Sequence, residues 1–185
     1  MGKLIVSEDC NGIKGLKVIT PEVHGDDRGY FVETYNYNDF AAIGIDCQFV
    51  QDNQSASKKG VLRGLHSQKQ YPQDKLVRVI KGEVFDVAVD LRPGSKTYGK
   101  WEGVILTEEN KKMFMIPRGF AHGFVVLSEF AQFQYKVDNV YAPQAERTLR
   151  FDDEALGIDW KVEKSQMLLS EKDLRGIELK NIKPF

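Results

Sequence analysis

The chain has 185 residues, a length that fits one domain with a sizeable buried core. Hydrophobic residues make up 42% and charged residues 29%, which is typical of a globular rather than a disordered protein. The 26 basic and 27 acidic residues give a net charge of -1, which argues against binding of nucleic acid by bulk charge but is compatible with a local basic pocket for a phosphate. No apolar run approaches the about 20 residues of a membrane span, so we expect neither nucleic acid nor membrane as a partner.

The first residues and the cysteines indicate a cytoplasmic location. The apolar stretch that ends at Val6 is too short for a secretory signal, and a myristoylation signal would need Ser or Thr where Val6 stands. Cys10 and Cys47 have no motif spacing and are interpreted as ordinary reduced residues.

No repeat or linker divides the sequence, so we predict a single domain over residues 1–185. In it we distinguish an N-terminal arm of about residues 1–50, a barrel of about 51–150 and a C-terminal tail of about 151–185.

In chain order, the arm is expected to form strands between residues 16 and 50, with a polar turn at 24–29 and a helix at Tyr37–Ile43 capped by Asn36. From about residue 60 to 150, short alternating runs between turn residues predict strands at Leu76–Ile80, Val84–Asp90, Gly103–Thr107, Lys112–Ile116, Ala121–Leu127 and Gln132–Val137. A short helix is expected after Ser170. This pattern is typical of an all-β sandwich or barrel.

The run 84–90 alternates with a period of two, and its less apolar face carries Asp86, Ala88 and Asp90. A partly acidic face either meets solvent or lines the interior of a barrel, and both alternatives stay open here.

Two of the three histidines lie in informative surroundings. Gly60 with His66, and the run from Pro117 to His122, each resemble half of the metal-binding signature of cupins. The set of metal ligands is incomplete, because Gln68 occupies the second position of the expected His-x-His pair and no Glu follows at the usual distance. We therefore predict no metal and histidines that are available for proton transfer.

Cations surround His66 in the sequence. Arg63 precedes it by three residues and Lys75 follows it by nine. A neutral imidazole beside an ammonium group suits removal of a proton α to a carbonyl, with Lys75 stabilising the enolate oxygen. Tyr135 and Tyr141 are phenols available to return a proton on the opposite face.

With these motifs, the chain closely resembles the dTDP-4-dehydrorhamnose 3,5-epimerase family, over nearly its whole length and in the same order. The matching segments are 26–34 in the arm, 51–55, 60–66, 75–79, 82–92 and 119–124 in the centre, and 169–173 in the tail. The resemblance implies an all-β, cupin-type double-stranded β-helix (jelly roll) barrel with an N-terminal β arm and a short helical C-terminal tail.

The resemblance also implies an activity and a partner. It implies a homodimeric isomerase without metal or organic cofactor, which inverts carbons 3 and 5 of dTDP-4-dehydro-6-deoxy-D-glucose to give dTDP-4-dehydro-L-rhamnose in dTDP-L-rhamnose synthesis.

Carried onto matching positions, the resemblance makes His66 the base, Asp173 its carboxylate partner, Tyr135 the acid and Lys75 the group that stabilises the enolate. The sugar and phosphate pocket would be lined by Gln51, Asn53, Arg63, Asp86, His122 and Tyr141. Nucleotide contacts delivered by the arm to the neighbouring subunit would come from Arg28, Phe31 and Glu33.

Some positions depart from the family pattern. Ser67 stands where an aromatic residue is usual, residues 71–74 form an unusual version of the loop before Lys75, and Trp160 is followed by Lys161 instead of proline. Ser67 bears on the pocket wall and therefore on substrate preference.

Structural alternatives remain for each of these residues. His66 and the tyrosines could be buried structural residues, and Asp173 could serve only in a capping box with Ser170. Arg28, Glu33, Lys75 and Asp86 could simply face solvent. The alternatives for function are an epimerase of one position or a ketoisomerase, a non-catalytic cupin that binds a nucleotide sugar, and a metal-dependent cupin.

Overall fold

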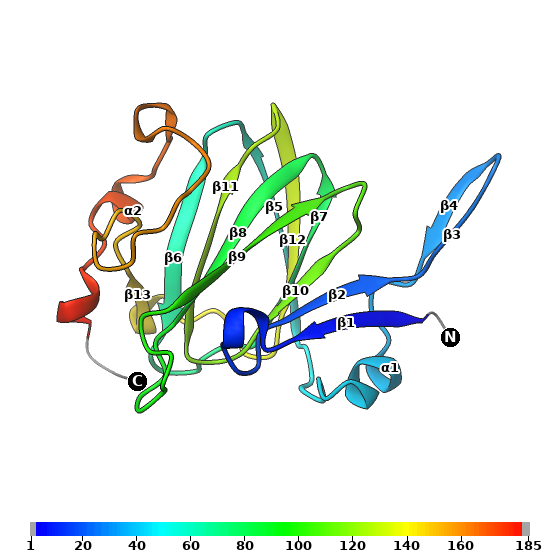
Figure 1. Ribbon diagram of the computed structural model, residues 1–185, viewed down its shortest axis with the longest axis horizontal. Coiled ribbons are helices and arrows are strands. Elements are labelled where there is room, and N and C mark those ends of the chain that lie inside the picture. Colours follow the sequence, from blue (N-terminus) through cyan, green and yellow to red (C-terminus); the bar gives the residue numbers. More distant parts are fainter. Residues whose placement is uncertain (1–2, 183–185) are drawn as a thin grey trace.

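Two antiparallel sheets lie face to face in the computed structural model, which describes residues 3–182 (Figure 1). The larger sheet has six strands in the order β1 (Leu4–Glu8), β2 (Lys17–Pro21), β10 (Met113–Ile116), β7 (Lys75–Lys81), β12 (Phe130–Val137) and β5 (Gln51–Lys58). The smaller sheet has five, in the order β13 (Glu146–Thr148), β6 (Leu62–Gln68), β11 (Phe120–Val126), β8 (Glu83–Asp90) and β9 (Trp101–Thr107).

Helices are few and short. The α-helices are α1 (Tyr37–Ala42) and α2 (Glu171–Leu174), and short 3-10 helices lie at Cys10–Gly12, Pro143–Ala145, Lys164–Gln166 and Leu179–Asn181. The predicted all-β class is therefore confirmed, although the two sheets remain open at their edges and do not close into one hydrogen-bonded barrel. The division of the chain into one domain with arm, barrel and tail stays a prediction.

The main core lies between the two sheets. Phe114 of β10 and Phe133 of β12 pack there against Val84 and Ala88 of β8 and Phe124 of β11. This resolves the open question about β8: the face that carries Asp86 points into the interior rather than to solvent, and Asp86 is completely buried.

The outer face of β8 is covered as well. Phe85, Val87 and Val89 pack against residues of the C-terminal tail, including Phe151 and Trp160. The tail therefore wraps the five-stranded sheet from outside, which also brings α2 against β6 (Figure 1).

The N-terminal segment covers the other sheet. Asn36 caps α1, because its side chain accepts hydrogen bonds from the backbone N–H groups of Asn38 and Asp39, as the sequence predicted. Phe40 of this helix packs with Ile19 and Met113 on the six-stranded sheet.

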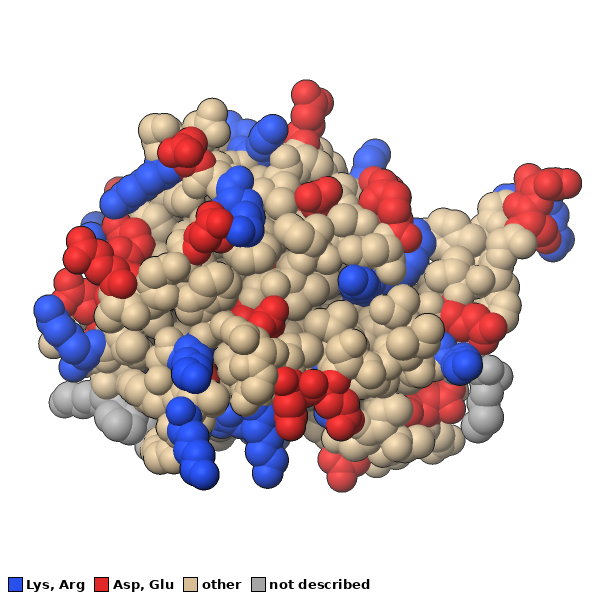
Figure 2. Space-filling model, in the orientation of Figure 1, with Lys and Arg blue, Asp and Glu red and all other residues tan. Residues whose placement is uncertain are grey.

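Strands β3 (Val23–Asp26) and β4 (Gly29–Val32) form a hairpin that projects from the body of the molecule (Figure 1). Tyr30 and Phe31 on this hairpin are 61% and 67% exposed. Acidic and basic side chains are interspersed over the face shown in Figure 2, in keeping with the small net charge. None of the helices among residues 3–182 has the length and hydropathy needed to cross a bilayer.

Candidate active site

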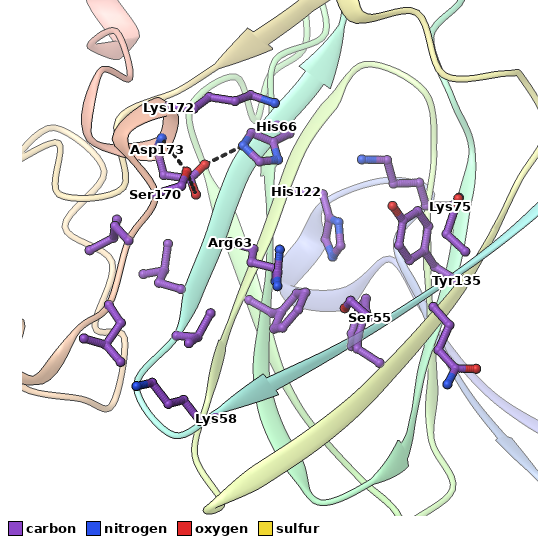
Figure 3. Close-up of a pocket in the computed structure, with 18 residues that line it drawn as sticks. Ser55, Lys58, Arg63, His66, Lys75, His122, Tyr135, Ser170, Lys172 and Asp173 are labelled. Carbon is purple, nitrogen blue, oxygen red and sulfur yellow. Dashed lines mark hydrogen bonds and ion pairs between the residues drawn. The ribbon is translucent and has the colours of Figure 1, made fainter.

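One cleft of about 800 Å³ opens between the two sheets and the C-terminal tail. Seven of the residues predicted for the site lie in its wall: Asn53, Arg63, His66, Lys75, His122, Tyr135 and Asp173. Figure 3 shows His66 and Asp173 on one side of the cleft, Lys75 and Tyr135 on the opposite side, and His122 between them. The cleft therefore holds an imidazole and a phenol on walls that belong to different sheets.

His66 and Asp173 are in direct contact although 107 residues separate them in the sequence. The Nε2 atom of His66 lies 2.6 Å from Oδ1 of Asp173. Burial raises the pKa of the Asp173 carboxyl, but hydrogen bonds from His66 and Ser170 outweigh it and the net pKa is lowered, so this group is ionised. An ionised acceptor at Nε2 holds the proton there and leaves the lone pair of Nδ1 to act as a base.

Asp173 takes part in the predicted capping box and also contacts His66. Ser170 is the N-cap of α2, and its hydroxyl accepts a hydrogen bond from the backbone N–H of Asp173. The same hydroxyl donates to Oδ2 of Asp173 at 2.7 Å, while Oδ1 faces His66. The cap thus fixes the carboxylate that orients the imidazole.

His122 and Asp86 form a second buried pair. Nε2 of His122 lies 2.9 Å from Oδ2 of Asp86. Burial raises the pKa of Asp86, although the hydrogen bond and charge of His122 and the charge of Lys75 oppose this shift. Burial also lowers the pKa of His122, although Asp86 opposes that shift. The neutral imidazole of His122 is thereby favoured, with one ring nitrogen engaged by Asp86.

Lys75 begins β7 at the edge of the cleft. Burial lowers its pKa to about 8, and the charges of Asp86 and Glu146 oppose this shift. The side chain is therefore mostly an ammonium at neutral pH, yet it is more acidic than an exposed lysine and better matched to an enolate oxygen.

The two tyrosines occupy different environments. Burial and the charge of Glu146 raise the pKa of Tyr135, opposed by Arg63, so the phenol in the cleft keeps its proton. Tyr141 lies outside the residues that line the cleft, is 52% exposed, and donates a 2.7 Å hydrogen bond to Oε2 of Glu146. The geometry thus places Tyr135, and not Tyr141, opposite His66.

Side-chain hydrogen bonds hold the remaining predicted pocket residues. Arg63 donates from Nε to the hydroxyl of Ser57 at 3.1 Å. Gln51 donates to the side-chain oxygen of Asn53 at 2.8 Å, but only Asn53 lines the cleft. Ser67 is buried and is not part of the cleft wall, because alternation along β6 turns it away from the side that His66 faces.

The arm residues are not brought into this cleft by their own chain. Arg28 pairs with Asp26 at the tip of the hairpin, where its side chain is 90% exposed, and Phe31 lies on the adjacent strand. Glu33 directly follows that strand.

Gln68 has a structural task. Its amide donates to the carbonyl oxygens of Tyr71 and Val140 and accepts from the backbone N–H of Ala142. Among residues 3–182, Cys47, Asp74 and Asp138 are the one group of three side chains near enough to share a metal ion, and it includes neither His66 nor His122. Both carboxylates of that group already interact with Arg118.

Three residues close to His66 and Asp173 were not assigned to the site from the sequence. Ser170 holds Asp173, Lys172 lines the cleft, and Glu146 of β13 lies beside His66. Lys172 could have been found as the neighbour of Asp173 in the matching segment 169–173. Glu146 carries no sequence signal, because only the pairing of β13 with β6 brings it there.

Comparisons with known proteins place the chain in a family. The family model described as dTDP-4-dehydrorhamnose 3,5-epimerase matches residues 11–181. The dTDP-4-dehydrorhamnose 3,5-epimerase of Pseudomonas aeruginosa is 56% identical over 165 residues, covering 89% of this chain and 91% of the relative.

Solved structures share the fold. The dTDP-6-deoxy-D-glucose-3,5-epimerase of Legionella pneumophila, in complex with dTDP-4-keto-L-rhamnose, superposes with a TM-score of 0.94 at 48% identity, covering 98% of this chain and 95% of that one. A double mutant of a 3'-monoepimerase from Streptomyces bikiniensis, in complex with dTDP, has a TM-score of 0.84 at 31% identity and covers 91% of this chain and 85% of that one. These likenesses confirm the predicted fold class.

Proposed function

From the premise that the chain belongs to the dTDP-4-dehydrorhamnose 3,5-epimerase family, we propose that it converts dTDP-4-dehydro-6-deoxy-D-glucose to dTDP-4-dehydro-L-rhamnose. Both inverted carbons lie next to the ketone, so their protons are the acidic ones. The enzyme is an isomerase of carbohydrate derivatives, and its place is the synthesis of dTDP-L-rhamnose.

The observation that carries this proposal is the placement of a base, a cation and a phenol around one cleft. We propose that Nδ1 of His66 removes the α proton: the C–H bond breaks, an N–H bond forms, and the electron pair moves to the ketone oxygen as an enolate. Asp173 stabilises the imidazolium that results, and Lys75 stabilises the enolate oxygen.

Inversion needs a proton from the opposite side of the sugar ring. Tyr135 belongs to the six-stranded sheet and His66 to the five-stranded sheet, so a sugar bound between them meets each on a different face. The raised pKa of Tyr135 keeps the phenol protonated until it reprotonates the enolate carbon.

The neighbouring groups have binding roles in this proposal. Asn53, Arg63 and His122 contact the sugar and phosphates from the cleft wall, and Asp86 orients His122. Gln51 and Tyr141 act through their partners Asn53 and Glu146.

We further propose a homodimer in which the β3–β4 hairpin of one subunit supplies Arg28, Phe31 and Glu33 to the nucleotide site of the other. The hairpin supports this because it projects from the body of the molecule with Tyr30 and Phe31 exposed, where a neighbouring subunit can reach them. Free thiols at Cys10 and Cys47 suit the reducing cytoplasm.

Solvent exchange tests the reaction. The protein is incubated with the dTDP-4-keto-6-deoxy sugar in deuterated water, and carbons 3 and 5 are followed by NMR. Deuterium at both positions with formation of the L-rhamno product supports the double epimerase. Incorporation at carbon 3 alone would instead assign a monoepimerase, which the likeness to the Streptomyces bikiniensis enzyme makes the second candidate.

A further inference from the structure

Glu146 is a partly buried carboxylate on the far side of the His66 ring from Asp173. Its side chain is 11% exposed, and Oε1 lies 3.7 Å from Nδ1 of His66. That distance exceeds hydrogen-bond length, so the carboxylate does not occupy the lone pair that a base needs. The other oxygen, Oε2, accepts hydrogen bonds from Tyr141 at 2.7 Å and from Lys172 at 2.5 Å.

The position of Glu146 follows from strand pairing. β13 lies antiparallel to β6, with Thr148 opposite His66 and Glu146 opposite Gln68. Glu146 and His66 thus project from neighbouring strands two register positions apart, which is within reach of a glutamate side chain.

The imidazole of His66 faces charged or titratable groups from several elements. Asp173 and Lys172 come from α2, Glu146 from β13 and His122 from β11, while Lys75 of β7 and Tyr135 of β12 lie across the cleft. Two of the groups next to the ring are carboxylates, so a proton arriving at Nδ1 would lie between two negative charges.

The charge on Glu146 also reaches the other reacting groups. Burial raises the pKa of Glu146, but hydrogen bonds from Lys172 and Tyr141 and the charge of His66 outweigh it, so the net pKa is lowered and the group is ionised. After burial, its charge is the next influence that raises the pKa of Tyr135, and with Asp86 it raises that of Lys75.

We infer that Glu146 is a positioning residue that stabilises the protonated forms of the base, the acid and the cation at once, with Lys172 partly neutralising it. The inference deepens the proposed function and rests on it for its catalytic meaning. A carboxylate beside the base stabilises the imidazolium that forms as the C–H bond breaks, and the same charge favours the protonated form of the Tyr135 phenol.

A purely structural role makes different demands. If Glu146 only tethered Tyr141 and Lys172, removing its charge would change local order but would not shift the protonation of His66 in a defined direction. An electrostatic role predicts opposite shifts for loss of Glu146 and loss of Lys172, because one removes a negative charge and the other a positive one.

The test is an NMR titration of ¹⁵N-histidine-labelled free protein, which reads His66 without any substrate. Only three histidines are present, and His66→Asn assigns the signal. We expect the titration midpoint of His66 to fall by about 1 pH unit in Glu146→Gln and to rise in Lys172→Met. Glu146→Asp should restore part of the shift, Tyr141→Phe should leave it largely in place because the charge remains, and Glu178→Gln at a surface pair with Lys180 should leave it unchanged.

Kinetics then separate the two proposals. In Glu146→Gln the acidic limb of the kcat/KM profile should move to lower pH and kcat at pH 7 should fall, with a smaller effect on KM. Unmoved midpoints in both Glu146→Gln and Lys172→Met, with folded proteins by circular dichroism, would overturn the inference even if the wild type epimerises. If the midpoints shift in the two variants but the wild-type protein shows no turnover, the electrostatic role is supported and the proposed function is refuted.

Discussion

Single side chains in the cleft depend on which face of a strand they occupy. Along β6, alternation points His66 into the cleft and Ser67 away from it, so the unusual Ser67 does not alter the cleft wall directly. The cluster of His66, Asp173, Lys75 and Tyr135 could be named from sequence motifs, but the sequence did not show that these side chains meet.

Replacing the proposed base tests the chemistry at this scale. His66→Ala removes the group that accepts the α proton, so we expect kcat to fall by a factor of about 10² to 10⁴ while dTDP binding is kept. Turnover and calorimetric binding of dTDP measure the two effects. Near-normal turnover would contradict the assignment.

The low pKa of Lys75 gives a second prediction. Because burial lowers this pKa to about 8, the ammonium is lost as the pH rises through that value, and kcat/KM should decrease above about pH 8. Lys75→Met should lower kcat and remove this alkaline limb from the residual activity. Lys180→Met, at an exposed lysine, serves as the control. If the alkaline limb persists in Lys75→Met, the limb belongs to the titration of another group.

Among the elements, β8 shows what sequence alternation can predict about a strand and what it cannot. Its alternation was correctly interpreted as a strand, but both faces are buried, one by the opposite sheet and one by the tail. Strand β5 (Gln51–Lys58) was not predicted, because it is polar except for Ala56 and lies at the sheet edge with alternate side chains exposed. Its hydrogen bonds to β12 define it.

The turn after β8 depends on Asp90. This buried carboxylate accepts hydrogen bonds from the guanidinium of Arg92 and from the hydroxyls of Ser95 and Thr97. Although burial raises its pKa, these bonds outweigh it and lower the pKa to about 2. Because the folded pKa lies below the unfolded value, the contribution to stability is present above about pH 4 and is lost as the pH falls towards 2.

We therefore expect Asp90→Ala to lower the free energy of unfolding by about 2 kcal/mol or more at pH 7. Urea denaturation at pH 7 and at pH 3 measures this, and the difference from wild type should shrink at the lower pH. The control Asp159→Ala removes an exposed partner of Lys161 and should have little effect. Equal losses in the two variants would contradict the prediction.

At the scale of the whole molecule, the projecting β3–β4 hairpin is the element whose predicted site residues do not reach the cleft of their own chain. Arg28 is too exposed on its own subunit to serve the cleft there, and the proposed exchange of arms gives it a site on a neighbour. We expect Arg28→Ala to raise KM with little change in kcat, as loss of a remote binding contact does. Asp27→Ala on the same turn is the matched control, and an unchanged KM would remove Arg28 from the nucleotide site.

Mixed dimers test the exchange itself. A dimer of one His66→Ala subunit and one Arg28→Ala subunit holds one intact site if arms serve the neighbour, and none if each arm serves its own subunit. After subunit exchange, we expect a fraction of activity with the wild-type KM. Activity that only averages the two parent variants would refute arm exchange.

The sequence by itself determined the all-β class, the capped helix α1 and the family resemblance, because alternation, turn residues and motifs are local. Through that resemblance it also named His66, Lys75, Tyr135 and Asp173 as candidate site residues. Tertiary structure decided the rest. It brought Asp173 across 107 residues to His66, buried Asp86 and placed Glu146 beside the base through the pairing of β13 with β6. Such contacts depend on sheet order and register, which are settled by burial of the whole core rather than by any local run of residues.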